Sequence, residues 1–183
     1  MAAAVTRLDY YNGASPVFTG GSFAGVTAES GFKFNREDTL SGTTPIPIPT
    51  ATGTNYSWIK NLALDVTTAG TTAITNRRIY AGSAPSTGLT LWYKAVATGS
   101  YAQAASGNLP AAGGTNGATP SGYTAMANSV GGASAYDASS VSTATQGVNG
   151  GLAVCVAGVD FSFAGGPGNA TALPSISITY DEA

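Results

Sequence analysis

The ionisable side chains limit the chemistry that this chain can perform. The sequence contains nine acidic residues, seven basic residues, one cysteine and no histidine. A Ser-His-Asp triad, a histidine general base and a histidine metal site are therefore excluded. Cys155 has no second cysteine to pair with, and its apolar context LAVCV (152–156) predicts a buried, inert thiol. We expect neither a metal nor a cofactor.

Carboxylates are the catalytic groups that remain. A glycosidase needs only two of them, about 5 to 9.5 Å apart. The isolated acids that a fold could bring together are Glu29, Glu37, Asp65, Asp137 and Asp160. The adjacent pairs Glu37–Asp38 and Asp181–Glu182 are instead typical of solvated turns. Because isolated acids between strands are usually solvated ends or caps, we expect no catalytic residues; a carboxylate-based glycosidase or lyase stays as the enzymatic alternative.

Other signatures of catalysis are missing from the sequence. The residues before Lys33, Lys60 and Lys94 are not glycine, so no phosphate-binding loop is present. The G-x-G at Gly166 and Gly168 lacks the third glycine of a dinucleotide site. No serine has glycines two residues away on both sides, as a nucleophile elbow requires. Serine-hydrolase chemistry therefore has no support in the sequence.

The basic residues form no nucleic-acid footprint. All seven lie in residues 1–94 together with five acids, whereas residues 95–183 carry four acids and no base. Arg77 and Arg78 are adjacent, and in a strand they point to opposite faces, so a joint phosphate clamp is not expected. We expect one of them to pair with a carboxylate of a neighbouring subunit. We expect no nucleic-acid partner.

Aromatic side chains could provide a binding surface. Trp58 lies on the apolar face of its predicted strand and is expected in the core. Trp92 lies opposite the leucines of its strand, so it faces either a second layer or a partner. Tyr10 and Tyr11 lie near the N-terminus, where an arm could contact a neighbour. The residues predicted to form an interface are Tyr10, Tyr11, Arg77, Arg78 and Trp92.

The elements that must position these residues are strands. Ala, Gly, Ser and Thr fill more than half of the 183 positions, and only 9% of the residues are charged. Period-two alternation is clearest over 56–66, 88–97 and 176–180. Weaker strands are expected at 23–27, 32–34, 74–80, 152–156 and 159–163. Without a helical apolar stripe, the pattern predicts one all-β domain over residues 1–183, a β-sandwich or jelly roll with extended arm or loop excursions.

Three segments are expected to leave this sandwich. Residues 1–15 are expected to form an N-terminal arm. Prolines at 45, 47 and 49 predict an extended connection over 43–50, because proline fixes φ and removes a backbone donor. Residues 98–150 are rich in small residues and carry few apolar anchors. We expect this segment to form small strands, or a long excursion that becomes ordered on a neighbouring subunit.

The sequence predicts neither secretion nor membrane insertion. Arg7 and Asp9 interrupt the apolar core that a signal peptide would need. The longest apolar run, 152–159, is far shorter than the roughly 20 residues that span a bilayer. We therefore expect synthesis and retention in a cytoplasm, and no membrane partner.

Two stretches of the chain resemble a known group of proteins. Residues 25–66, GVTAESGFKFNREDTLSGTTPIPIPTATGTNYSWIKNLALDV, and the closing LPSISITYDEA (173–183) resemble the small β-rich virion structural proteins of tailed bacteriophages. This resemblance implies few charges, abundant small residues and a β-sandwich whose arms reach across neighbouring subunits. The group includes capsid decoration or cement proteins, neck proteins and tail proteins.

The resemblance implies assembly and not catalysis. We expect a non-enzymatic virion protein, made in the host cytoplasm, that decorates the capsid as a symmetric homo-oligomer. Its partners would be the major capsid protein or other virion subunits, whose neighbouring copies it would bridge. A chain with a small core gains stability chiefly from contacts in an ordered array. The alternatives are a neck or tail structural protein, or a glycan- or receptor-binding module that uses exposed Trp92, Tyr93 or other tyrosine faces.

Overall fold

The computed structural model describes residues 2–18, 26–27, 33–39, 43–50, 52–108, 119–163 and 175–183. Within these residues the chain forms strands joined by loops and by three single-turn 3-10 helices. The helices are η1 (Thr98–Ser100), η2 (Ser106–Asn108) and η3 (Val130–Gly132). The strands form two sheets, and every pairing described in them is antiparallel. The expected all-β fold is confirmed.

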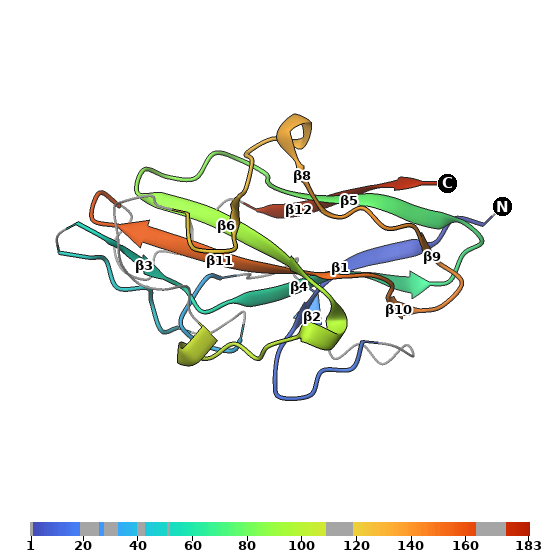
Figure 1. Cartoon of the computed structure of the whole chain (residues 1–183), viewed down its shortest axis with the longest axis horizontal. Coiled ribbons are helices and arrows are strands. Elements are labelled where there is room, and N and C mark those ends of the chain that lie inside the picture. The colour runs from blue at the N-terminus through green and yellow to red at the C-terminus, as the bar shows by residue number, and fades with distance from the viewer. Residues whose placement is uncertain are drawn as a thin grey trace.

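The larger sheet contains eight strands. They are β1 (Val5–Tyr11), β2 (Val26–Thr27), β3 (Thr54–Tyr56), β4 (Lys60–Thr68), β6 (Leu89–Val96), β7 (Thr124–Ala125), β10 (Gly147–Val148) and β11 (Leu152–Asp160). Their order is β2-β1-β4-β11-β6-β7, with β10 beside β4 and β3 beside β11 (Figure 1). β4 and β11 are therefore the central strands.

The smaller sheet contains four strands. They are β5 (Ala73–Ala81), β8 (Ser134–Asp137), β9 (Val141–Ser142) and β12 (Ile176–Glu182). Their order is β12-β5-β8, and β9 also pairs with β5. Figure 1 shows β12 and β5 running along one side of the larger sheet, with both chain ends at the same end of the molecule.

The main core lies between the two sheets. Leu62, Leu91 and Cys155 from the larger sheet meet Ile79 and Tyr136 from the smaller sheet in one cluster of buried side chains. Two packed antiparallel sheets with a shared apolar interior form a β-sandwich. Cys155 is fully buried, which confirms the prediction for this residue. Burial raises the pKa of its thiol, which is therefore protonated at neutral pH.

The outer face of the larger sheet is buried as well. Three small clusters lie on it, around Leu152, around Trp92 and around Ile59. Side chains from loops cover these clusters: Phe18, Tyr101, Ala104 and Tyr123. Because both of its faces are covered, β11 is buried from Leu152 to Val159 and reads as a continuous apolar run.

A bulge divides the strand predicted over 56–66. β11 pairs Gly158 with Tyr56 but Cys155 with Lys60, so three residues on one strand face two on the other. Ser57 fills the gap: its N–H donates to the Ala157 carbonyl at 2.8 Å, and its hydroxyl accepts from the Ala157 N–H at 3.0 Å. The extra residue reverses the side-chain alternation. The prediction of one strand with one apolar face is therefore wrong.

The predicted N-terminal arm is instead part of the larger sheet. β1 pairs with β4 along its whole length, from Val5 opposite Thr68 to Tyr11 opposite Asn61. Alternation explains this position, because Tyr10 enters the main core while Tyr11 joins the cluster on the outer face. Residues 5–11 are thus a strand whose two faces both pack against other parts of the chain.

The other irregular segments behave closer to expectation. Residues 43–50 have no strand, and Ile46 anchors this proline-rich connection in the main core. In the part of 98–150 that is described, the first of the two alternatives holds, because β7, β8, β9 and β10 are short strands that pair within this chain. Residues 109–118 lie outside the described residues.

The remaining strand predictions have mixed outcomes. The strands expected at 74–80, 88–97 and 176–180 are confirmed as β5, β6 and β12. The strands expected at 152–156 and 159–163 form the single strand β11, which ends at Asp160. Within 23–27 only β2 is described, and residues 33–34 of the segment 32–34 are not in a strand.

Candidate functional site

Most of the residues predicted to form an interface are buried within the chain. The exposed fraction is 1% for each of Tyr10, Tyr11, Arg77 and Trp92. The tyrosines are buried because β1 is a strand of the larger sheet and not an arm. Trp92 faces a second layer, which was one of its two predicted alternatives. Arg78 is the one predicted interface residue whose side chain is accessible, at 39%.

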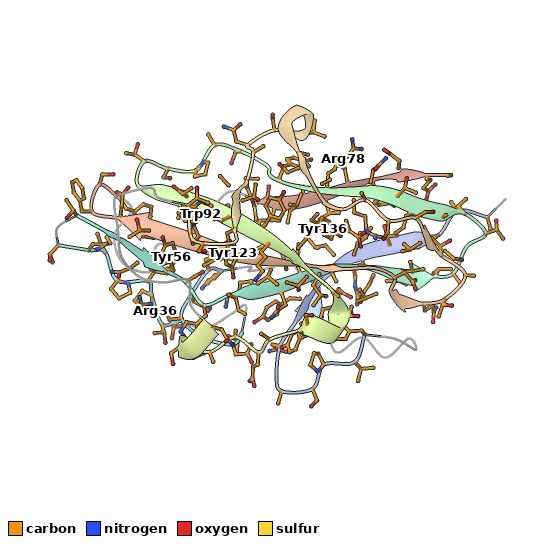
Figure 2. All side chains as sticks on the ribbon, viewed as in Figure 1. Arg36, Tyr56, Arg78, Trp92, Tyr123 and Tyr136 are labelled. Atoms are coloured by element: carbon orange, nitrogen blue, oxygen red, sulfur yellow. The ribbon has the colours of Figure 1, made fainter. Side chains whose placement is uncertain are left out.

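Trp92 lies in an aromatic cluster on the outer face of the larger sheet (Figure 2). Its ring meets Tyr56 edge-on, with ring centroids 5.7 Å apart, and Tyr123 packs against the same cluster. Gly158 lies beneath the indole, and a Cβ atom there would overlap the ring. Tyr93 is buried on the opposite face. Neither ring named for glycan stacking is therefore exposed.

A group of charged residues that we call the acid cluster lies between β1 and β4. It consists of Arg7, Asp9, Tyr11 and Asp65, which alternation places on the outer face of the sheet. The Arg7 guanidinium donates to both oxygens of Asp9, at 2.6 and 2.7 Å. The Tyr11 hydroxyl donates to Asp65 Oδ2. Both carboxyl groups are fully buried.

The two carboxyl groups of the acid cluster have different partners. Burial and the neighbouring Asp9 carboxylate raise the pKa of Asp65 to about 7, against the hydrogen bond from Tyr11. Asp9 forms an ion pair with the Arg7 guanidinium, whereas Asp65 accepts a hydrogen bond from the Tyr11 hydroxyl. Two neighbouring carboxyl groups in different surroundings have the components of acid–base catalysis. Because neither group is exposed to solvent, the acid cluster joins β1 to β4 and offers no access to a substrate.

Lys60 organises the loop over residues 33–39. Its ammonium donates to Asn35 Oδ1 at 2.7 Å and to the carbonyl oxygens of Glu37 and Thr39 at 2.7 and 2.9 Å. The side chain is fully buried. Burial lowers the pKa of Lys60 to about 8, while Asp38 and Glu37 act in the opposite direction. The lysine that interrupts the apolar pattern of its strand is thus a fixed cation with three oxygen partners.

Asp38 ties the same loop to two other segments. Its carboxylate accepts from the Tyr10 hydroxyl at 3.2 Å, the Gly13 N–H at 2.9 Å and the Gln103 amide at 2.8 Å. Glu37 accepts from the Thr44 hydroxyl and N–H, which lower its pKa. The Glu37–Asp38 pair does lie in a turn, as expected, but its carboxylates bind protein donors.

Arg77 joins the smaller sheet to the segment that follows β10. Its guanidinium forms an ion pair with Asp137 at 2.5 Å and donates to the Asn149 carbonyl at 2.8 Å. Burial alone would raise the pKa of Asp137, but bonds from Ser139 and Gly151 and the charge of Arg77 lower it to about 2. The expected pairing with a neighbouring subunit is not needed for Arg77, because its partner lies in the same chain.

Arg78 lies on the opposite face of β5 (Figure 2). Its guanidinium pairs with Asp181 of β12 at 2.8 Å, and the Asn76 amide donates to the same carboxylate at 2.9 Å. Both partners of the ion pair are exposed, at 39% and 51%. The prediction that Arg77 and Arg78 point to opposite faces is confirmed.

Four of the five acids considered for a glycosidase lie in the described residues, and each of these four has its own local donor. Asp65 binds Tyr11, Asp137 binds Arg77, Glu37 binds Thr44, and Asp160 accepts from the Ser162 N–H and hydroxyl at 2.8 and 2.6 Å. Glu29 lies outside the described residues. Sequence reasoning missed Asp9, the carboxyl group next to Asp65 in the acid cluster, because residues 1–15 were interpreted as an arm. The alternation R-x-D-x-Y over residues 7–11 was the signal that a strand face carries these groups.

An open groove lies beside the Arg77–Asp137 pair. It has a volume of about 410 Å³ and is lined by residues that include Val96, Thr98, Tyr136 and Asp137. Its charged group, Asp137, already has its donors. Within the described ranges no three His, Cys, Asp or Glu side chains are grouped as metal ligands, and no helix there is long and apolar enough to span a membrane.

Comparison with known proteins does not assign the chain to a family. No family model, no curated protein and no solved structure matches it.

Proposed function

We propose that this chain is a non-enzymatic structural protein of a bacteriophage particle. Its role would be that of a capsid decoration protein, which stabilises the head by bridging neighbouring capsid subunits. The observation that carries the proposal is that the buried charged groups bind other parts of the same chain. Lys60, Arg77 and the acid cluster each join a strand to another strand or loop of the same chain.

This use of charge favours a structural role. An enzyme keeps its ionisable groups open to substrate, with protonation states matched to a reaction. Here Lys60 and Arg77 are buried and bound to protein oxygens, and the loops that they hold are fixed relative to the sheets. A sandwich with fixed loops can present the same surface to every neighbour in a repeating shell.

The low charge of the chain also suits dense assembly. Only 9% of the residues are charged, and the formal net charge is −2. Electrostatic repulsion between neighbouring copies is therefore weak, and small side chains allow backbones to approach closely. The resemblance of residues 25–66 and 173–183 to small phage virion proteins points to the same role.

Binding to particles that lack the protein tests the proposal. We expect saturable binding at many symmetry-related sites of the head and a higher temperature of particle disruption. Electron microscopy would locate the added density, and a thermal-release assay of packaged DNA would measure the stabilisation. Binding at one vertex or along the tail would assign a neck or tail role. No binding to any particle surface would contradict a virion role.

A further inference from the structure

We propose that β12 pairs along its free edge with β12 of a second copy of the chain. The two strands would run antiparallel about a two-fold axis at Ile178 and join the two smaller sheets into one. The proposal stands independently of the virion role, because it rests on the edge of the sheet alone.

The edge of β12 is open in the described part of the molecule. β12 ends the order β12-β5-β8 and pairs there only with β5. Natural proteins usually blunt such an edge with charges, prolines or a covering loop. In β12 the charges are Asp181 and Glu182 at its end, and Asp181 is neutralised by Arg78. The stretch Ile176–Tyr180 carries no charge.

The hydrogen-bonding groups of this edge are regularly spaced. The Gly82 N–H donates to the Ser175 carbonyl at 2.6 Å, so alternate residues from Ser175 onward direct their backbone groups to β5. The N–H and C=O groups of Ile176, Ile178 and Tyr180 therefore point to the free edge. The irregularity between the two strands places the extra residue on β5, where Asn76 has a φ of +47°. β12 itself remains regular.

The edge is complementary to itself. A two-fold axis at Ile178 sets this residue opposite its own copy and sets Ile176 opposite Tyr180 of the second copy. All three then lie in hydrogen-bonded pairs. The two-fold axis repeats each contact, as in every isologous interface. In this register Asp181 lies opposite Ser175, so no acid faces an acid. A strand with charges in its centre would not have this property.

The side chains of β12 also favour a second copy. Ile176 and Ile178 pack against the main core, and the Tyr180 hydroxyl contacts Thr6 Oγ1 of β1 at 3.0 Å, so all three lie on the inner face. They remain only half-buried because β12 is at the edge. Pairing two copies would place Ile178 beside Ile178 and Ile176 beside Tyr180, and would complete their burial.

The oligomeric state of the full chain tests this proposal. We expect light scattering to give twice the mass of one chain, and Ile178→Lys to halve that mass, because two lysines would then face each other at the axis. Ile178→Thr is the control: it also removes the isoleucine side chain from the core contact but adds no charge, and it should remain a dimer. A wild-type monomer at all concentrations, or an Ile178→Lys protein that stays dimeric, would overturn the proposal.

A cross-link provides a second measurement that does not depend on the lysine variant folding. Hydrogen-bonded antiparallel residues have Cα atoms about 5.5 Å apart, which a disulfide can span. We expect Ile178→Cys to form a covalent dimer under mild oxidation. Phe161→Cys, at an exposed position on the turn after β11, should not. Equal cross-linking of the Ile178→Cys and Phe161→Cys proteins would contradict the proposed pairing of Ile178 with its own copy. If the protein stays monomeric but binds an added extended peptide, a second copy is excluded as the occupant of the β12 edge.

Discussion

Arg77 and Arg78 are neighbours on β5 and lie in opposite environments. Arg77 is buried and binds Asp137, and the Asn149 carbonyl accepts a hydrogen bond from it. Arg78 is exposed and pairs with Asp181, which is also exposed. The residue type, the strand and the charge of the partner are the same in both cases, so what differs is the access of water.

This difference separates structural charges from surface charges. Water screens the Arg78 pair, and its contribution to stability is expected to be small. The Arg77 side chain is 1% exposed and that of Asp137 is 15% exposed, so removing one partner would leave the other largely buried without its ion pair. The charged residues of this chain can therefore be ranked by burial before any of them is mutated.

Loss of Arg77 should produce the largest effect. We expect Arg77→Ala to lower the free energy of unfolding by about 3 to 5 kcal/mol, because Asp137 and the Asn149 carbonyl lose their buried donor. Urea denaturation followed by circular dichroism measures the change. Replacing both partners, as Arg77→Met with Asp137→Asn, should recover part of the loss. Equal losses for Arg77→Ala and Arg78→Ala would contradict the comparison.

A methyl group added beside Arg77 should have the next largest effect. Gly150 has a φ of +131°, and a Cβ atom there would overlap the Arg77 guanidinium. We expect Gly150→Ala to destabilise the protein by about 1 to 3 kcal/mol, through backbone strain and displacement of the arginine. Gly99→Ala is the control, since no atom lies within 4 Å of the added carbon. Thermal melts of the two variants should differ clearly.

The pH dependence of stability tests the acid cluster. The pKa of Asp65 is raised to about 7 in the folded protein. A raised carboxyl pKa favours the folded state while the group is protonated, so stability should fall as pH rises from the ordinary carboxyl range to about 7. Asp65→Asn should remove this fall, and the exposed Asp181→Asn should leave it unchanged. Denaturation curves between pH 5 and pH 7.5 provide the measurement.

Loss of Arg78 should produce the smallest effect. We expect Arg78→Ala to change the free energy of unfolding by about 0 to 1 kcal/mol, and raised salt concentration to reduce even that difference. Urea denaturation at low and high salt measures both. A loss close to that of Arg77→Ala, or one that salt does not change, would show that the outer pair is held in a buried contact.

Much of the fold could be predicted because alternation is a local property. Period two identified β6 and β12, and β5 was predicted as a weaker strand in which Arg77 and Arg78 point to opposite faces. β11 was only partly identified, because a strand covered on both faces shows a continuous apolar run. The periodic signal is thus strongest where one face of a strand meets water.

The candidate site was harder to predict because loops distant in the sequence create it. Asp9 and Lys60 look like surface residues until the segments that contain Tyr101 and Asn35 cover their strands. The bulge at Ser57 has no periodic signal, since it is recognised by its pairing with β11. These charges are buried by segments that are distant in the sequence, so composition and local spacing cannot predict their burial.

The bulge at residues 57–59 also restricts how the length of this chain can change. Deleting one of these residues would restore a continuous strand and turn Tyr56 from Trp92 toward the main core. Inserting one residue there would change the parity in the same way, whereas changes by two residues would preserve it. The number of residues between β3 and β4 therefore determines which face of the sheet each side chain of β3 occupies. Insertions in natural variants should be found in the surrounding loops and not at this bulge.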